Sequence, residues 1–308
     1  MARACEGDSF VYRLWPSRSD GHELRLGSPE PAQGAVRFSG VRYALFLPPF
    51  RELADPRVLA ELAVRAEAAG WDGLFVWDHV HRAPVGGVGD PWIGLAAVAA
   101  ATERLIIGPM VTPLARRRPQ IVARQATGLD QLSAGRLVLG VGLGLDGRGR
   151  ELSAFGEELD GRRRAALLDE SLEVLDALWS GQEVHHAGTA FLADGVRFLP
   201  RPLQQPRIPV WVAGRHPNTA PMRRAARWDG AFPIDLDHPG QLAEMVAMIA
   251  QARGDAGMDR FEVAAEGWPG DDPRPYAAAG ATWWLVRFDP ETISADGARA
   301  VIDSGPPR

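Results

Sequence analysis

From Val41 onward, short apolar segments alternate with longer segments that carry apolar residues at helical spacing, and this alternation constrains the fold most. A run of about four to eight apolar residues predicts a buried strand, and apolar residues three or four positions apart predict an amphipathic helix. Strands that alternate with helices are typical of a parallel sheet with crossover helices. The predicted strands are residues 41–50, 74–77, 105–112, 136–141, 208–214, 230–234, 261–267 and 282–288.

The first predicted helix has recognisable ends. Asp55 and Pro56 combine an N-cap residue with proline at the first helical position, and Gly70 is a typical stop. The other predicted helices are residues 92–102, residues 119–132, a segment with Leu168, Leu172, Leu175 and Trp179 on one face, a short segment with Met222 and Arg223, and residues 239–252, 273–279 and 291–303.

Eight strand-helix units over roughly 250 residues match the size of a TIM (β/α)8 barrel. A doubly wound open sheet is the alternative, but it rarely needs so many repeats. Residues 183–205 interrupt the alternation, and the pairs Ala187-Gly188 and Asp194-Gly195 predict a β-hairpin insertion there. We therefore expect one barrel domain at residues 41–308, preceded by an N-terminal extension at residues 1–40 without a clear period.

All 34 basic residues are arginines, because the chain contains no lysine. This excludes Schiff-base lysine chemistry, pyridoxal phosphate attachment and a lysine-dependent phosphate loop. With 39 acidic residues the formal net charge is −5, so no overall positive field favours nucleic acid or an anionic membrane. We expect a small-molecule substrate, with neither nucleic acid nor membrane as a partner.

The single cysteine, Cys5, cannot form an intramolecular disulfide, which suits a reducing compartment. No uninterrupted apolar run approaches the roughly 18 residues that span a bilayer. Glu6 and Asp8 stand where a signal peptide would be basic, and no apolar segment follows them. We therefore expect a cytoplasmic protein.

Asp78 and His79 stand side by side directly after the predicted strand at residues 74–77. The carboxyl ends of parallel barrel strands form the end of the barrel that carries active sites, which we call the mouth. Adjacent side chains on an extended chain point to opposite faces, so only one of these two can face the mouth. We place His79 there, because imidazole exchanges protons near neutral pH, and expect Asp78 to fix the backbone or the ring. A purely structural Asp-His pair is the alternative.

His79 and His81 also resemble the paired histidines of metal-dependent hydrolase barrels. Such a site needs further ligands at later strand ends. Lysine is absent, and the downstream histidines fall in the predicted hairpin or in later loops: His185, His186, His216 and His238. We expect no metal site, and keep a metal-dependent hydrolase as the third functional hypothesis.

Residues 142–147, GLGLDG, follow a predicted strand and match G-x-G-x-x-G. A lone match is weak evidence for a dinucleotide site, and the residues that follow do not begin a packed helix. We expect instead that Gly142 and Gly144 let a flat ring system approach the strand end closely. A glycine-rich rim without a ligand is the alternative.

Gly108 and Pro109 break the third predicted strand, which is tolerated at a bulge or a strand end. A planar cofactor resting on such a bulge would contact Met110 and Val111, and plain strand termination is the alternative.

Ala213, Gly214 and Arg215 end the fifth predicted strand and precede a short helix. Small residues, an arginine and a helix amino terminus together favour an anion such as a cofactor phosphate. An ordinary capped helix beside a surface arginine is an equally common arrangement.

These segments together resemble the bacterial luciferase-like monooxygenase family of flavin- or deazaflavin-dependent oxidoreductases, from about Val41 to the end of the chain. The resemblance lies in AAGWDGLFVWDHV (residues 68–80), the segment from residue 101 to residue 144, LEVLDALWSG (172–181), FLPRPLQ (198–204), IPVWVAG (208–214), RRAARWDGAFP (223–233) and AGATWW (279–284).

The resemblance implies a TIM barrel that binds FMN or an 8-hydroxy-5-deazaflavin at the mouth, usually as a homodimer. It implies that Asp78-His79 is the family's Asp-His pair, with the histidine near the reacting ring. It also implies a non-prolyl cis peptide bond between Met110 and Val111. The chain departs from the family at Trp77, where a serine is common, and at Leu145, where some members have an acid.

Our first functional hypothesis is therefore an oxidoreductase that transfers hydride or activates oxygen at a reduced flavin or deazaflavin ring. The catalytic candidates are Asp78 and His79. The cofactor-binding candidates are Met110, Val111, Gly142, Gly144, Ala213, Gly214 and Arg215. A non-catalytic flavin-binding barrel is the second hypothesis. It is favoured by the altered phosphate site after the fifth predicted strand, where the family often has paired glycines and this chain has Arg215 in second place, and where a facing Asp235 would repel a phosphate.

Overall fold

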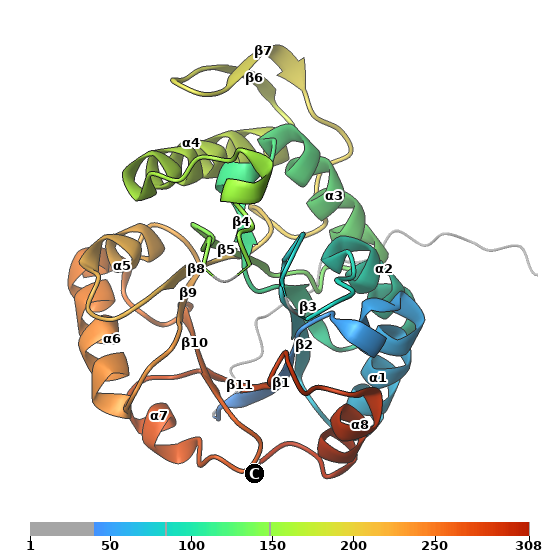
Figure 1. The fold of residues 1–308 in the computed structure, drawn as a ribbon. Coiled ribbons are helices and arrows are strands. Elements are labelled where there is room, and N and C mark those ends of the chain that lie inside the picture. Colours follow the sequence, from blue (N-terminus) through green and yellow to red (C-terminus); the bar gives the residue numbers. More distant parts are fainter. Residues whose placement is uncertain (1–39, 84, 148, 308) are drawn as a thin grey trace, which may run out of the picture. The chain divides into compact units, whose positions relative to one another are not determined.

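The computed structural model describes residues 40–83, 85–147 and 149–307. Residues 1–39, on which the predicted N-terminal extension falls, lie outside the described residues. The described chain contains a parallel barrel surrounded by helices (Figure 1). Its barrel strands are β1 (Arg42–Leu47), β2 (Gly73–Val76), β3 (Ile106–Pro109) with β4 (Thr112–Pro113), β5 (Leu139–Gly142), β8 (Val210–Gly214), β9 (Gly230–Pro233), β10 (Glu262–Gly267) and β11 (Trp283–Arg287).

The strand order closes the sheet into a barrel. In the sheet the order is β3-β2-β1-β11-β10-β9-β8-β5-β4. β3 and β4 are two parts of one strand, interrupted at Met110 and Val111, and they stand at the two ends of this order. A parallel bridge between Ile107 and Leu137 joins β3 to the segment leading into β5. The predicted TIM barrel is therefore confirmed, with each predicted strand segment in place.

The helices form an outer ring around the strands (Figure 1). They are α1 (Pro56–Ala68), α2 (Pro91–Ala101), α3 (Pro119–Leu132), α4 (Gly161–Trp179), α5 (Thr219–Ala225), α6 (Pro239–Arg253), α7 (Arg274–Ala278) and α8 (Ala295–Asp303). Asp55 caps α1 by accepting a hydrogen bond of 2.9 Å from the amide of Arg57. The last helix begins at Ala295 rather than at Glu291, because Ser294 is its N-cap and accepts from the amide of Gly297.

Two layers of apolar side chains follow from the alternation along each strand. In β1, Leu45 and Leu47 pack outward against the helices, whereas Ala44 and Phe46 point into the barrel. The interior is filled mainly by large side chains: Phe46, Phe75, Met110, Trp211, Phe232, Trp283 and Leu285. The barrel is thus a packed core, and a ligand has to bind above it, at the mouth.

The predicted insertion is a two-stranded antiparallel hairpin, β6 (Glu183–Ala187) and β7 (Leu192–Arg197), which extends beyond α4 (Figure 1). The hairpin is therefore confirmed. Its turn lies between Ala187 and Leu192, and Asp194 lies within β7, where it pairs with His185. In the described part of the chain, no helix is both long enough and apolar enough to cross a membrane.

Candidate functional site

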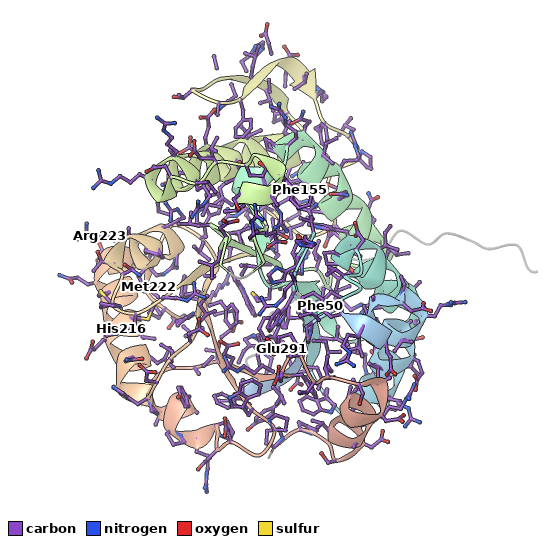
Figure 2. All side chains as sticks on the ribbon, in the orientation of Figure 1. Phe50, Phe155, His216, Met222, Arg223 and Glu291 are labelled. Atoms are coloured by element: carbon purple, nitrogen blue, oxygen red, sulfur yellow. The ribbon has the colours of Figure 1, made fainter. Side chains whose placement is uncertain are left out.

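His79 lies at the mouth, just beyond the end of β2, with its side chain 23% exposed. The ring lies against Phe50, labelled in Figure 2, and Trp77, at centroid separations of 5.6 and 5.8 Å. Nδ1 is 2.8 Å from Oε2 of Glu151 and donates its hydrogen to that carboxylate. Among the described residues Nε2 has no hydrogen-bond partner. Nε2 is therefore the nitrogen that can exchange a proton with a ligand.

Glu151, in the loop between β5 and α4, holds the His79 ring, and the sequence analysis did not select it. Its side chain is 4% exposed. Besides His79 it accepts a 2.5 Å hydrogen bond from the amide of Val80 and forms a 2.8 Å ion pair with Arg116. Burial alone would raise the pKa of Glu151, but the hydrogen bond from His79 and the nearby charges lower it overall. Glu151 is therefore an ionised positioning residue for His79.

The side chain of Asp78 is completely buried and lies in an ion-pair cluster with two arginines, Arg116 and Arg117. Its carboxylate receives hydrogen bonds from Arg116 and Arg117 at 2.8 to 3.0 Å. The hydroxyl of Thr112 and the indole nitrogen of Trp92 donate to its Oδ2 at 2.8 and 3.3 Å. Arg116 also donates to the backbone carbonyl of Asp78 at 2.8 Å. Of the two roles expected for Asp78, it therefore fixes the backbone that carries His79, whereas Glu151 orients the imidazole ring.

The two histidines that suggested metal hydrolysis have separate partners. His79 binds Glu151, whereas the ring of His81 makes an edge contact with Phe155 at a centroid separation of 6.2 Å. Phe155, labelled in Figure 2, belongs to the short η3 helix (Ser153–Phe155). Across the described ranges, no group of three or more His, Cys, Asp or Glu side chains could hold a metal ion.

The peptide bond between Met110 and Val111 is cis, as the resemblance predicts. The neighbouring glycines of β5 have a packing role. A Cβ at Gly142 would lie 2.9 Å from Cγ2 of Val111, and Gly144 has a positive φ of 73° and lies against Pro113. These contacts support the alternative reading, a tight rim, for the glycines. Contact of these four residues with a cofactor remains a prediction.

Ala213, Gly214 and Arg215 end β8, as predicted, but the arginine already has a partner. Nε of Arg215 is 2.8 Å from Oδ2 of Asp235, which follows β9. A Cβ at Gly214 would lie 2.5 Å from Pro221, so this glycine allows α5 to pack closely against β8. Figure 2 labels Met222 and Arg223 on this helix. Binding of a cofactor phosphate here remains a prediction, and the ion pair with Asp235 does not favour it.

Barrel closure brings most candidates to one part of the mouth. The strands before His79, Met110-Val111, Gly142 and Gly144 are β2, β3 and β5, which are neighbours around the closed barrel. The chain segments that supply Glu151 and Arg116 come from loops after β5 and β4. Arg215 lies one strand further, after β8. The site is therefore centred on His79, with Arg215 at its edge.

The chain is similar in sequence to known proteins. A family model described as luciferase-like monooxygenase matches residues 39–269. The F420-dependent glucose-6-phosphate dehydrogenase of Beutenbergia cavernae is 34% identical over 210 residues, covering 67% of this chain and 60% of that protein. The protein of the same name from Nakamurella multipartita is 33% identical over 186 residues, covering 59% of this chain and 52% of that protein. The chain thus matches less than two thirds of the length of these relatives.

Solved structures show the same fold at low identity. An F420-dependent secondary alcohol dehydrogenase in complex with an F420-acetone adduct superposes with a TM-score of 0.72 at 18% identity, covering 86% of this chain and 98% of that chain. Monooxygenase RslO1 from Streptomyces bottropensis gives a TM-score of 0.71 at 18% identity, covering 85% and 96%. The match of the family model, together with this barrel and its mouth, means that the chain belongs to the luciferase-like monooxygenase family.

Proposed function

We propose that the chain is a deazaflavin-dependent oxidoreductase that acts on a small organic substrate, with His79 as its acid-base residue. The observation that carries this proposal is the His79 ring itself: Nδ1 is fixed by Glu151, the side chain is 23% exposed, and Nε2 has no partner among the described residues. The relatives named F420-dependent dehydrogenases support a deazaflavin rather than FMN.

The partly exposed ring of Trp77 beside His79 offers an aromatic surface to a flat ring system. Phe50 is completely buried and packs against the imidazole without facing a ligand. The indole nitrogen of Trp77 is buried and has no hydrogen-bond partner among the described residues, so it is a donor without an acceptor. When bound, a deazaflavin supplies the carbon that accepts or donates hydride.

His79 would move the proton that accompanies hydride transfer. Its Nε2 takes a proton from a substrate hydroxyl during oxidation, or returns one to a carbonyl during reduction. Glu151 stabilises the imidazolium that forms, because its ionised carboxylate lies 2.8 Å from Nδ1. The Asp78 cluster keeps the backbone of His79 in place throughout, because Arg116 binds both Asp78 and Glu151.

The test is a titration of the full chain with the 8-hydroxy-5-deazaflavin and with FMN, followed by hydride exchange with a panel of small alcohols and ketones. We expect binding of the deazaflavin, and a loss of turnover of about 100- to 10,000-fold in His79→Ala with the cofactor still bound. His81→Ala is the matched control, because His81 lies two residues further on and contacts Phe155 instead. Unchanged turnover in His79→Ala, or no binding of either cofactor, contradicts the proposal.

We also propose, from the family resemblance, that the chain forms a homodimer and acts in the cytoplasm. Light scattering coupled to gel filtration tests the first point, since one chain has a mass of 33.3 kDa. A single peak at the monomer mass across concentrations contradicts it.

A further inference from the structure

A second part of the mouth, away from His79, contains a pocket of about 490 Å³ at the carboxyl ends of β9, β10 and β11. In the sheet, β10 is separated from β2 by β1 and β11. The lining that matters here is Asp235, Glu266, Trp268, Asp271 and Arg287. Neither the family comparison nor the acid-base role of His79 accounts for these residues.

Glu266 is the buried acid of this pocket. It lies two residues beyond Ala264, which points into the barrel, so Glu266 points to the same side at the mouth. Its side chain is only 7% exposed. Both of its polar contacts use Oε1, which accepts from the amide of Asp235 and from Arg287, each at 3.2 Å. Oε2 has no hydrogen-bond partner among the described residues, and is therefore the oxygen left for a ligand in the pocket.

The environment of Glu266 favours its protonated form. Burial raises the pKa of Glu266, and the nearby charge of Arg287 opposes that rise without cancelling it. The carboxylate of Asp235, whose amide donates to Glu266, raises the pKa further. A carboxyl group that keeps its proton can both donate and accept a hydrogen bond, which suits a hydroxyl group as its partner.

The arginines near the pocket are already engaged. Arg287 binds Glu266, lies 3.6 Å from Asp235 and stacks 4.1 Å from the ring of Trp268. Arg215 is bound by Asp235. The pocket lining contains five acids, Asp235, Asp237, Glu266, Asp271 and Asp272, and one arginine, Arg287. A phosphoryl group would meet an excess of negative charge here, with no arginine free to neutralise it.

We propose that Glu266 determines the substrate specificity of the mouth: its pocket takes an uncharged, hydroxyl-bearing part of the substrate and excludes phosphorylated groups. This inference rests on the proposed function, since it assigns the pocket to the substrate of that reaction. A site built to hydrogen-bond a hydroxyl group discriminates strongly against molecules that cannot make the bond.

The experiment measures binding of glycerol, glucose, myo-inositol and inorganic phosphate to the full chain by ligand-observed NMR and calorimetry. We expect the unmodified protein to bind at least one of the three polyols and to bind phosphate more weakly than that polyol. Glu266→Leu and Glu266→Asp should each weaken polyol binding by about tenfold, the loss that one hydrogen bond to a buried carboxyl group produces. The aspartate variant keeps a carboxyl group on this strand and only shortens its reach, so it separates a loss of binding from a failure to fold.

Glu262→Gln is the matched control. Glu262 lies on the same strand and the same side, but at the opposite end of the barrel, where it binds Arg42 and Thr282. It should leave polyol binding unchanged. Absence of polyol binding, tighter binding of phosphate, an unchanged Glu266 variant, or an equal loss in Glu262→Gln each overturns the proposal. Polyol binding without binding of either cofactor contradicts only the proposed redox function.

Discussion

Glu151 and Glu266 are two buried glutamates at the same mouth, each beside an arginine, and their pKa values move in opposite directions. The pKa of Glu151 is lowered against the effect of burial, because His79, the amide of Val80 and Arg116 all stabilise its charge. The pKa of Glu266 is raised, because burial outweighs the one arginine and the one amide that contact it. Both carboxyl groups are buried, so the number of hydrogen-bond donors and positive charges around each one sets the direction of its pKa shift.

Groups whose environments separate their pKa values are suited to different tasks. Glu151 is an ionised residue that positions an imidazole, and it has no oxygen free for a substrate: one oxygen binds His79 and the other binds Val80 and Arg116. In Glu266, Oε2 has no hydrogen-bond partner among the described residues, and the pKa of the carboxyl group is raised. This difference is the basis for our proposal that the His79 side of the mouth serves proton transfer and the Glu266 side serves substrate recognition.

The largest effect should come from breaking the buried ion pairs on the His79 side. Asp78→Asn leaves Arg116 and Arg117 buried without a full counter-charge, because the side chain of Asp78 is completely buried. We expect a loss of about 3–5 kcal/mol in the free energy of unfolding, measured by urea titration. Asp235→Asn is the control on the other side, where the exposed pair with Arg215 is worth about 1 kcal/mol or less. Equal losses in the two variants would remove the distinction between the two sides.

A smaller effect should separate the kinetic roles of the two glutamates. Glu151→Gln removes the charge that stabilises the imidazolium of His79, so we expect kcat to fall by about a hundredfold with little change in KM. Glu266→Leu should instead raise KM by about tenfold, because it removes a contact with the bound substrate. Steady-state kinetics of both variants with the same substrate check this split. A fall in kcat for Glu266→Leu alone would reverse the assignment.

The smallest effect concerns the pH dependence of stability. Because the folded pKa of Glu151 is lowered, its contribution is present above its ordinary pKa of 4.5 and is lost as pH falls through the folded value. Because the folded pKa of Glu266 is raised, its contribution is present below 4.5 and is lost as pH rises through the folded value.

Relative to the unmodified protein, Glu151→Gln should therefore lose thermal stability as pH rises from about 4 to about 8, and Glu266→Gln should gain it. Each difference should amount to about 2–4 °C in Tm, followed by circular dichroism. Two difference curves of the same sign would show that one of the two environments is described wrongly.

The sequence was sufficient to predict the barrel and the place of His79 beyond a strand end, and insufficient to select Glu151 and Glu266. Strands and helices repeat with fixed periods, so each barrel strand and the position of His79 at a strand end follow from local patterns. Glu151 contacts His79 from a loop 72 residues later in the chain. Loops lack the periodic residue patterns from which strands and helices are predicted, so this contact could not be predicted. Glu266 stands in a strand whose pattern, FEVAAEG, does not show which arginine or amide will lie beside it.

The partners of Asp78 and Gly142 in the folded chain also could not be predicted from the sequence. The strand-end positions predicted that Asp78 fixes the backbone or the His79 ring and that Gly142 admits a flat ring system. They did not show that Arg116 and Arg117 bind Asp78, or that Val111 lies beside Gly142. Both partners arrive through barrel closure between β3, β4 and β5, which is a tertiary event. Composition and spacing identify residues that can do chemistry, and only packing shows which of them are free to do it.

The aromatic side chains that fill the barrel interior stabilise the fold, whereas the residues at the strand ends are those proposed to contact a ligand. Phe75, Trp211 and Trp283 contact one another below the mouth at centroid separations of 5.6 to 5.8 Å, so this layer can stay unchanged while the strand ends vary. A library restricted to strand-end positions such as Trp77 and Glu266 would therefore sample new substrates at little cost to folding. The same division gives evolution a route from one substrate to another through a few codons, each at the end of a different strand.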